Sequence, residues 1–147
     1  EKGEALKNKL TRLVDADTHA FNRILQAFAM PKSNDDEKLW RNRAIQDATR
    51  FAIDIPFTVM QTAFESMEVI RAMAEIGNPN SVSDAGVGAL CARSAVMGAF
   101  MNVRINTTDY DDKEFVKEII AKGKAIEDKA MALEAEILSI VNAKIGA

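Results

Sequence analysis

Residues Gly77–Asn106 read GNPNSVSDAGVGALCARSAVMGAFMNVRIN. The segment opens as a loop rich in glycine, proline and asparagine, and then enters an apolar helix whose small residues recur at steps of three and four. That spacing places them on one stripe of an α-helix, formed by Ala85, Gly88, Ala92, Ala95, Ala99 and Asn102. Each glycine inside a helix costs about 1 kcal/mol relative to alanine. We therefore expect the stripe to lie against another backbone or a flat ligand, with the preceding loop holding the ligand's polar edge.

Periodic apolar positions predict helices before and after this segment. The first helix should run from about Gly3 to Ala29 and a second from the turn at Lys32–Asp36 to Gly77. The last helix should follow Thr108–Asp112, which has the composition of an N-terminal cap. No alternating strand pattern of useful length is present. The sequence thus predicts an all-α, antiparallel up-and-down bundle of four long helices, forming a single domain over residues 1–147.

Two local signals refine the second helix. Asn34 and Glu37 have the spacing of a capping box at its start. Pro56 lies inside its apolar pattern, and proline removes an amide donor and crowds the preceding turn. We therefore expect the helix to kink or restart at Pro56.

Composition and charge exclude several classes of protein. The formal net charge is −3 and the isoelectric point is about 5.3, which argues against a nucleic-acid partner because phosphate contact needs a basic face. One cysteine, Cys91, and one histidine, His19, make a disulfide or a metal site unexpected. Arg93 interrupts the most apolar segment, which argues against a membrane partner. The simplest location is a reducing cytoplasm.

Asp17 is the candidate catalytic residue. On a helical wheel of 100° per residue it lies within about 20° of both Leu6 and Phe28, on the apolar stripe of the first helix, whereas Asp15 points about 200° away. Burial of a carboxylate favours its protonated form, the condition for a general acid or base near neutral pH. The alternative is a structural acid paired with an arginine or a helix terminus.

Ser83 and Asp84 stand at the start of the small-residue helix. Serine and aspartate often cap helices there, so a purely structural role is one interpretation. The other is recognition of a ligand, because one carboxylate can accept two parallel N–H donors from a heterocycle. The remaining candidate substrate-binding residues are Phe21 on the apolar stripe of the first helix, Asn80 in the polar loop, and Asn102, which continues the small-residue stripe near the far end of its helix.

Three ordered blocks resemble the cyclodeaminase/cyclohydrolase family of tetrahydrofolate enzymes. They are DADTHAFNRILQAFAMPK at Asp15–Lys32, IPFTVMQTAFESMEVI at Ile55–Ile70, and GNPNSVSDAGVGAL with GAFMNVRIN inside Gly77–Asn106. The resemblance aligns Asp17 with the acidic residue that the family uses in catalysis. It aligns Ser83–Asp84 with the family's most recognisable motif, and implies that Asp84 accepts hydrogen bonds from the pterin edge of a folate.

This resemblance implies cyclisation of 5-formiminotetrahydrofolate to 5,10-methenyltetrahydrofolate with release of ammonia, a step in histidine degradation. The alternative enzyme is a methenyltetrahydrofolate cyclohydrolase, in which water attacks the same carbon with Asp17 as base. A non-catalytic helical interaction module is the alternative of another class. The resemblance further implies a folate substrate, no metal or organic cofactor, a homodimer with the ligand near its interface, and an association with a formiminotransferase module or protein.

Two features depart from the family pattern. The family's Gly/Ala-rich N-terminal helix, which follows a PGGGS-like turn, is absent from this sequence, so we expect a fragment or a chain without that helix. Relatives often carry a glutamate where this chain has Gln61, which puts the choice of reaction in question.

Overall fold

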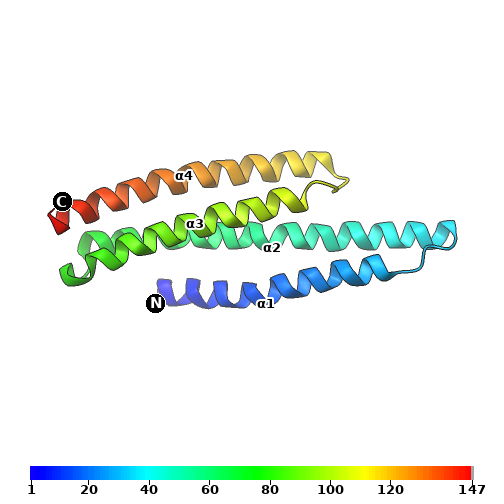
Figure 1. The fold of residues 1–147 in the computed structure, drawn as a ribbon, viewed down its shortest axis with the longest axis horizontal. Helices are drawn as coiled ribbons and strands as arrows, with labels where there is room; N and C mark the ends of the chain where they lie inside the picture. The colour runs from blue at the N-terminus through cyan, green and yellow to red at the C-terminus, as the bar shows by residue number, and fades with distance from the viewer. Residues whose placement is uncertain (147) are drawn as a thin grey trace.

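The computed structural model describes residues 1–146 and consists of long helices joined by short loops (Figure 1). The elements in chain order are α1 (Lys2–Ala29), α2 (Asp35–Ile76), the 3₁₀ turn η1 (Pro79–Ser81), α3 (Val82–Asn106) and α4 (Lys113–Ile145). No strand occurs among residues 1–146. The predicted all-α bundle of four long helices is confirmed, and the predicted start and end of α1 agree with the structure to within one residue.

The four helices are not equally enclosed. α3 packs against both α2 and α4, whereas α1 packs against α2 and makes no comparable contact with α3 or α4. The α1–α2 hairpin also extends past the loop between α3 and α4 (Figure 1). The main core lies among α2, α3 and α4, where the fully buried large side chains include Ile53, Met60, Met67, Val96, Val103 and Ile137. One side of α1 therefore remains open to solvent.

The predicted helix caps are present. The Asn34 side chain accepts a hydrogen bond from the Glu37 amide at 2.8 Å, and Glu37 Oε2 accepts one from the Ser33 amide at 2.7 Å. The returning carboxylate thus binds one residue before the N-cap rather than the N-cap itself. Asp112 caps α4 by accepting from the Phe115 amide at 3.0 Å. These bonds satisfy amides that have no partner inside the helix.

Pro56 does not interrupt α2, which is continuous from Asp35 to Ile76; the restart considered from the sequence is excluded. Because proline has no N–H, the carbonyl of Ala52, four residues earlier, loses its helical donor. The side chain of Asn106, at the end of α3, donates from Nδ2 to Ala52 O at 2.8 Å. One side chain thus replaces the missing backbone bond and fastens the end of α3 to the middle of α2.

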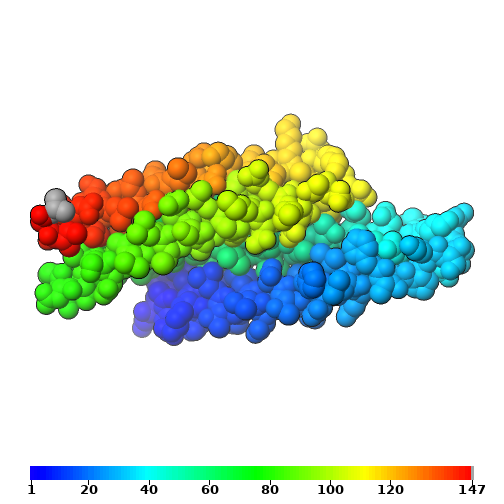
Figure 2. All heavy atoms as spheres, in the orientation of Figure 1, coloured from blue at the N-terminus to red at the C-terminus, as the bar shows by residue number. Residues whose placement is uncertain are grey.

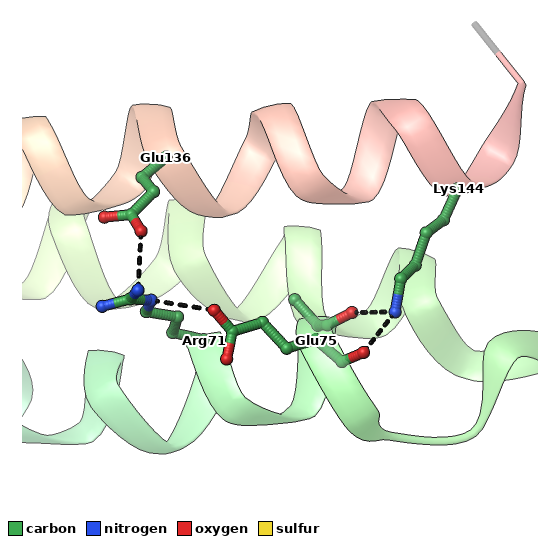
Figure 3. A network of polar contacts seen from close by, with 5 residues as sticks. Arg71, Glu75, Glu136 and Lys144 are labelled. Carbon is green, nitrogen blue, oxygen red and sulfur yellow. Dashed lines mark hydrogen bonds and ion pairs between the residues drawn. The ribbon is translucent and has the colours of Figure 1, made fainter.

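A polar network fixes the other end of α2 (Figure 3). Lys144 of α4 donates from Nζ to the carbonyl oxygens of Ala74 and Glu75 in the last turn of α2, where a cation suits the helix C-terminus. Arg71 pairs with Glu75 at 3.2 Å and with Glu136 of α4 at 3.0 Å. The loop that leads into α3 therefore starts from a position held by α4.

The small-residue stripe of α3 is buried over only part of its length. Ala85, Ala92 and Ala99 are buried and Gly88 is half-buried, whereas Ala95 and Asn102 are exposed. A Cβ at Gly88 would lie 3.6 Å from the side chain of Ile70 on α2, an ordinary contact distance. The expected helix–helix contact is therefore confirmed over part of the stripe, and its C-terminal half opens onto a groove.

By length and composition, Pro79–Asn106 is apolar enough to cross a membrane. In the structure, Val96 and Val103 of this segment are fully buried in the bundle. Arg93, halfway along, pairs with Glu134 of α4, with Nε 2.8 Å from Oε2. Burial in the bundle accounts for part of its apolar character, whereas Val87, Met101 and Ile105 on its other side are exposed.

The bond between Asn106 and Ala52 predicts a specific energetic coupling. Asn106→Ala should lower the free energy of unfolding by about 1–3 kcal/mol, because it leaves a buried carbonyl without a donor. In a Pro56→Ala background, where position 56 regains its N–H, the same change should cost about 1 kcal/mol less. Urea unfolding of the four proteins measures this, with Asn102→Ala as an exposed control expected to shift stability by under about 0.5 kcal/mol. If Asn106→Ala lowers the free energy of unfolding equally in both backgrounds, the Asn106 side chain does not replace the backbone donor that Pro56 removes.

Close packing predicts opposite responses at two helical glycines. A Cβ at Gly123 of α4 would fall within 2.6 Å of two ring carbons of Phe100, so the buried ring must move. Both Gly→Ala changes gain helix propensity, but only the one at Gly123 overpacks the core. Gly123→Ala should therefore be less stable than Gly88→Ala by about 1–3 kcal/mol in thermal or urea unfolding. Equal stabilities would show that the α3–α4 contact is looser than the structure has it.

Candidate functional site

A groove lies between α1 and α3, with α2 at its floor (Figure 2). We call it the α1–α3 groove. It has a volume of about 390 Å³, within the range of small-molecule sites. Its lining comprises Leu10, Leu13, Val14, Asp17 and Thr18 of α1, Pro56 and Val59 of α2, and Ala95, Ala99 and Asn102 of α3.

The sequence explains why the groove is open. Ala95 and Ala99 present only methyl groups on the side of α3 that faces α1, and α1 makes no extensive contact with α3. Apolar side chains of α1 and α2 supply most of the remaining wall, which suits a flat ring system. Polar groups enter from two opposite helices, with Asp17 and Thr18 on α1 and Asn102 on α3.

The predicted burial of Asp17 is wrong, because its side chain is exposed. The residues of α1 that are buried are Leu6, Ala20 and Ala27, which are separated by 14 and 7 residues and so lie on one side of the helix. Ala20 belongs to a cluster with Ala52 and Ile55 of α2. Asp17 lies about 60° around the helix from Ala20, at the edge of that contact, and no further helix among residues 1–146 covers it. Its carboxylate therefore meets water at the groove rather than an apolar interior.

Asp84 lies in a different hollow. This loop pocket has a volume of about 370 Å³ and is lined by Val69, Ile70, Met73, Gly77, Asn78, Ser81, Asp84 and Ala85. Its wall is largely apolar, and the carboxylate of Asp84 contributes the only charge. Ser83 and Asn80 are exposed and lie outside the lining.

A capping role does not account for this loop. Ser81 is the N-cap of α3, but its side chain makes no capping hydrogen bond. The Asn78 side chain instead accepts from the Asn80 amide at 3.0 Å and closes the 3₁₀ turn η1. The loop geometry is thus set by Asn78, and Asp84 makes no ion pair within residues 1–146.

The two polar features are far apart within one chain. Asp84 and Asn102 are 18 residues apart on α3, which corresponds to about 27 Å along the helix at 1.5 Å per residue. A pterin ring is much shorter than that. The structure therefore brings Asp17 and Asn102 together, but Asp84 of the same chain cannot bind the pterin edge of a ligand that reacts beside Asp17. Phe21, one turn beyond Asp17, is 59% exposed and outside the groove lining.

A further hollow, of about 610 Å³, is lined by Arg50 of α2, by Asp112 and by the first part of α4. Arg50 lies 3.5 Å above the Phe115 ring and pairs with Asp54 at 3.1 Å. Burial disfavours the Arg50 charge, but the neighbouring Tyr110 hydroxyl and the Asp54 carboxylate outweigh it and raise the pKa of Arg50. The Arg50 guanidinium already contacts the Phe115 ring and the Asp54 carboxylate, so it is not free to bind a ligand. We therefore assign this hollow a structural role.

Within residues 1–146, no three His, Cys, Asp or Glu side chains cluster in a way that could hold a metal ion. The expectation of catalysis without a metal or cofactor stays a prediction.

Comparison with known proteins identifies the family of this chain. The family model described as "Formiminotransferase-cyclodeaminase" matches residues 1–125. The chain belongs to this family. It is 34% identical over 145 residues to the methenyltetrahydrofolate cyclohydrolase of Methylorubrum extorquens, covering 99% of this chain and 70% of that protein. It is 31% identical over 140 residues to the formimidoyltransferase-cyclodeaminase of Rattus norvegicus, covering 95% of this chain and 26% of the relative.

A solved structure has the same fold. The formiminotetrahydrofolate cyclodeaminase of Thermotoga maritima superposes with a TM-score of 0.72 at 23% identity, covering 96% of this chain and 64% of that chain. The chain thus spans about a quarter of the rat family member and just under two thirds of the Thermotoga protein. The family resemblance and fold class inferred from the sequence are confirmed; the roles of the individual site residues remain predictions.

The sequence interpretation missed Thr18 and Pro56 as groove residues. Thr18 follows Asp17, lines the groove and donates from Oγ1 to the Val14 carbonyl at 3.3 Å. Pro56 was recognised only as a helix irregularity. Its position at the level of Asp17 follows from the pairing of α1 with α2, which the sequence pattern does not specify.

Proposed function

We propose that the chain is a tetrahydrofolate one-carbon enzyme that hydrolyses 5,10-methenyltetrahydrofolate. The observation that carries this proposal is the exposed carboxylate of Asp17 in a largely apolar groove, opposite the amide of Asn102. Family membership and the match along nearly the whole chain to a named methenyltetrahydrofolate cyclohydrolase support it. The sequence alone gave priority to the deamination reaction; the exposure of Asp17 and the extent of this match now favour hydrolysis.

The chemistry needs a base that contacts water. The methenyl carbon bridges N5 and N10 and shares their positive charge, so it is electrophilic. Asp17 would accept a proton from a water molecule as its oxygen bonds to that carbon. The resulting hydroxyl then loses its proton as the C=O bond forms and the C–N5 bond breaks. N5 keeps the electron pair and takes one of the two protons of the original water, the other is released to solvent, and the carbon remains on N10 as a formyl group. Asn102, on the opposite wall, would donate a hydrogen bond to the oxygen on which charge develops.

Cyclising deamination is the second candidate. Several formimidoyltransferase-cyclodeaminases match this chain at about 31% identity. In that reaction N10 attacks the formimino carbon on N5, and ammonia leaves after protonation. Asp17 would deliver that proton, so the same carboxylate serves both reactions with the proton moving in opposite senses. No observation favours the non-catalytic interaction module considered from the sequence.

Other properties stay proposals of the same kind. A homodimer, a formiminotransferase partner, a cytoplasmic location and a role in histidine degradation are expectations from the family resemblance. The combined name of the rat relative, and the small share of it that this chain spans, are consistent with a second module in some relatives.

The direct test follows the absorbance of 5,10-methenyltetrahydrofolate mixed with the purified chain. We expect the chromophore to disappear faster than in buffer. Formation of the chromophore from 5-formiminotetrahydrofolate would instead establish the deaminase. If the chain neither removes nor forms the chromophore faster than buffer does, the proposed function is wrong.

Replacing the proposed base separates catalysis from folding. Asp17→Asn keeps the shape of the side chain but cannot accept a proton, so turnover should fall by about 10²–10⁴-fold. Asp15→Asn is the matched control, because Asp15 is exposed on the same helix but points away from the groove. Circular dichroism should be unchanged in both. Wild-type turnover in Asp17→Asn would refute the assignment of the base.

Filling the groove should block binding without unfolding the bundle. Ala95 is exposed on the groove wall, so Ala95→Phe places a ring where the substrate would lie and should raise KM at least about tenfold, or about 1.4 kcal/mol in binding. Ala132→Phe changes an exposed alanine of α4, outside the groove lining, and should leave KM unchanged. An unaltered KM in Ala95→Phe would place the substrate elsewhere.

A further inference from the structure

Ala52, in the middle of α2, is joined to both helices that form the walls of the α1–α3 groove. Its methyl group belongs to a small buried cluster with Ala20 of α1 and Ile55 of α2. Its carbonyl oxygen accepts the hydrogen bond from Asn106 Nδ2 of α3 at 2.8 Å. We call Ala20, Ala52 and Asn106 the Ala52 junction. One residue of α2 thus serves as a common reference point for α1 and α3.

Each helix carries a groove residue about one turn from its member of the junction. These residues are Asp17 on α1, Pro56 on α2 and Asn102 on α3. The offsets are three, four and four residues, which correspond to about 4.5–6 Å along each helix. α2 runs antiparallel to both α1 and α3 (Figure 1), so all three offsets point in the same direction along the bundle. The proposed base, the groove floor and the proposed hydrogen-bond donor therefore lie at nearly one level.

Asn106 connects this level to the junction through both its backbone and its side chain. In an α-helix each amide donates to the carbonyl four residues earlier, so the Asn106 amide bonds the carbonyl of Asn102. The side chain of Asn102 is exposed, so the backbone of its turn determines where it lies. Asn106 is the last residue of α3 and is half-buried. Without its side-chain bond to α2, the last turn could shift against Asp17 while the rest of α3 stays packed.

We propose that Asn106 is a positioning residue, which through the Ala52 junction sets the level of Asn102 opposite Asp17 and thereby the rate of the chemical step. The inference rests on the proposed function, in which Asn102 donates to the oxygen that gains charge. Such a donor must lie at hydrogen-bond distance from that oxygen, and a displacement of about 1 Å can lower a rate by about 100-fold. Asn106 lies outside the groove lining, so it would act on the reaction only through Asn102.

Steady-state kinetics of Asn106→Ala test the positioning. We expect kcat for 5,10-methenyltetrahydrofolate to fall by about 10–100-fold. KM should change by less than about threefold, because the groove lining is intact. Wild-type kcat in Asn106→Ala would overturn the proposal.

Gln46→Ala is the matched control. The Gln46 side chain also ties α2 to the chain after α3, because it donates to Asp109 O at 3.4 Å and accepts from the Asp111 amide at 2.9 Å. It lies ten residues before Pro56, away from the groove. Its kcat should stay within about twofold of wild type. A loss of kcat as large as that of Asn106→Ala would show general loosening of the bundle, and would overturn the proposal.

A double-mutant cycle separates positioning from a loss of stability. If Asn106 acts through Asn102, Asn106→Ala should lower kcat by less than about threefold when residue 102 is already alanine. A merely structural effect would lower kcat by the same factor whether or not Asn102 is present. Equal factors in the two backgrounds would therefore exclude the positioning role.

Hydrogen exchange distinguishes failure of the positioning from failure of the proposed function. In Asn106→Ala the backbone amides of residues 102–106 should exchange at least about threefold faster than in wild type, whereas in Gln46→Ala they should be less affected. If the wild-type chain acts on neither folate, the proposed function is wrong. Faster exchange in Asn106→Ala would then still support its hold on the turn that carries Asn102, and unchanged exchange would overturn that as well.

Discussion

The hydrogen bond from Asn106 Nδ2 to the carbonyl of Ala52 sets the position of α3 on α2. Pro56 creates the need for it by removing the helical donor of that carbonyl. Because Asn106 is the last residue of α3, the bond fixes the register of the whole helix. Lys144 holds the far end of α2 through its last carbonyls. These contacts determine the position along α1 that Ala95, Ala99 and Asn102 of α3 face.

The groove follows from what these contacts leave uncovered. α1 packs against α2 alone, so its side toward α3 keeps Asp17 in water while Leu13 and Val14 supply apolar wall. The alanines of α3 add no bulk. An apolar slot with a carboxylate on one side and an amide on the other suits a flat cationic ring system whose reacting carbon must meet water. The packing of the helices thus produces a groove that suits the reaction proposed for this chain.

Much of the fold could be predicted from local signals. Asn34 and Asp112 act as the N-caps that their spacing indicated, and the apolar periodicity located all four helices. The burial of Asp17 was mispredicted because periodicity shows which stripe of a helix is apolar, but not whether a neighbouring helix covers it. The separation of Asp84 from Asp17 was missed because motifs give order along the chain, and not distance. The bond from Asn106 to Ala52 could not be predicted, because the two residues are 54 positions apart in the sequence.

The proposed function requires that the folate binds in the α1–α3 groove. A crystal structure of the chain with 5-formyltetrahydrofolate, which is stable in solution, tests this most directly. We predict density for the pterin between α1 and α3, with the one-carbon unit beside Asp17 and Asn102. Ligand density in the hollow at Arg50 and Phe115, with the groove occupied only by water, would show that the groove is not the folate site.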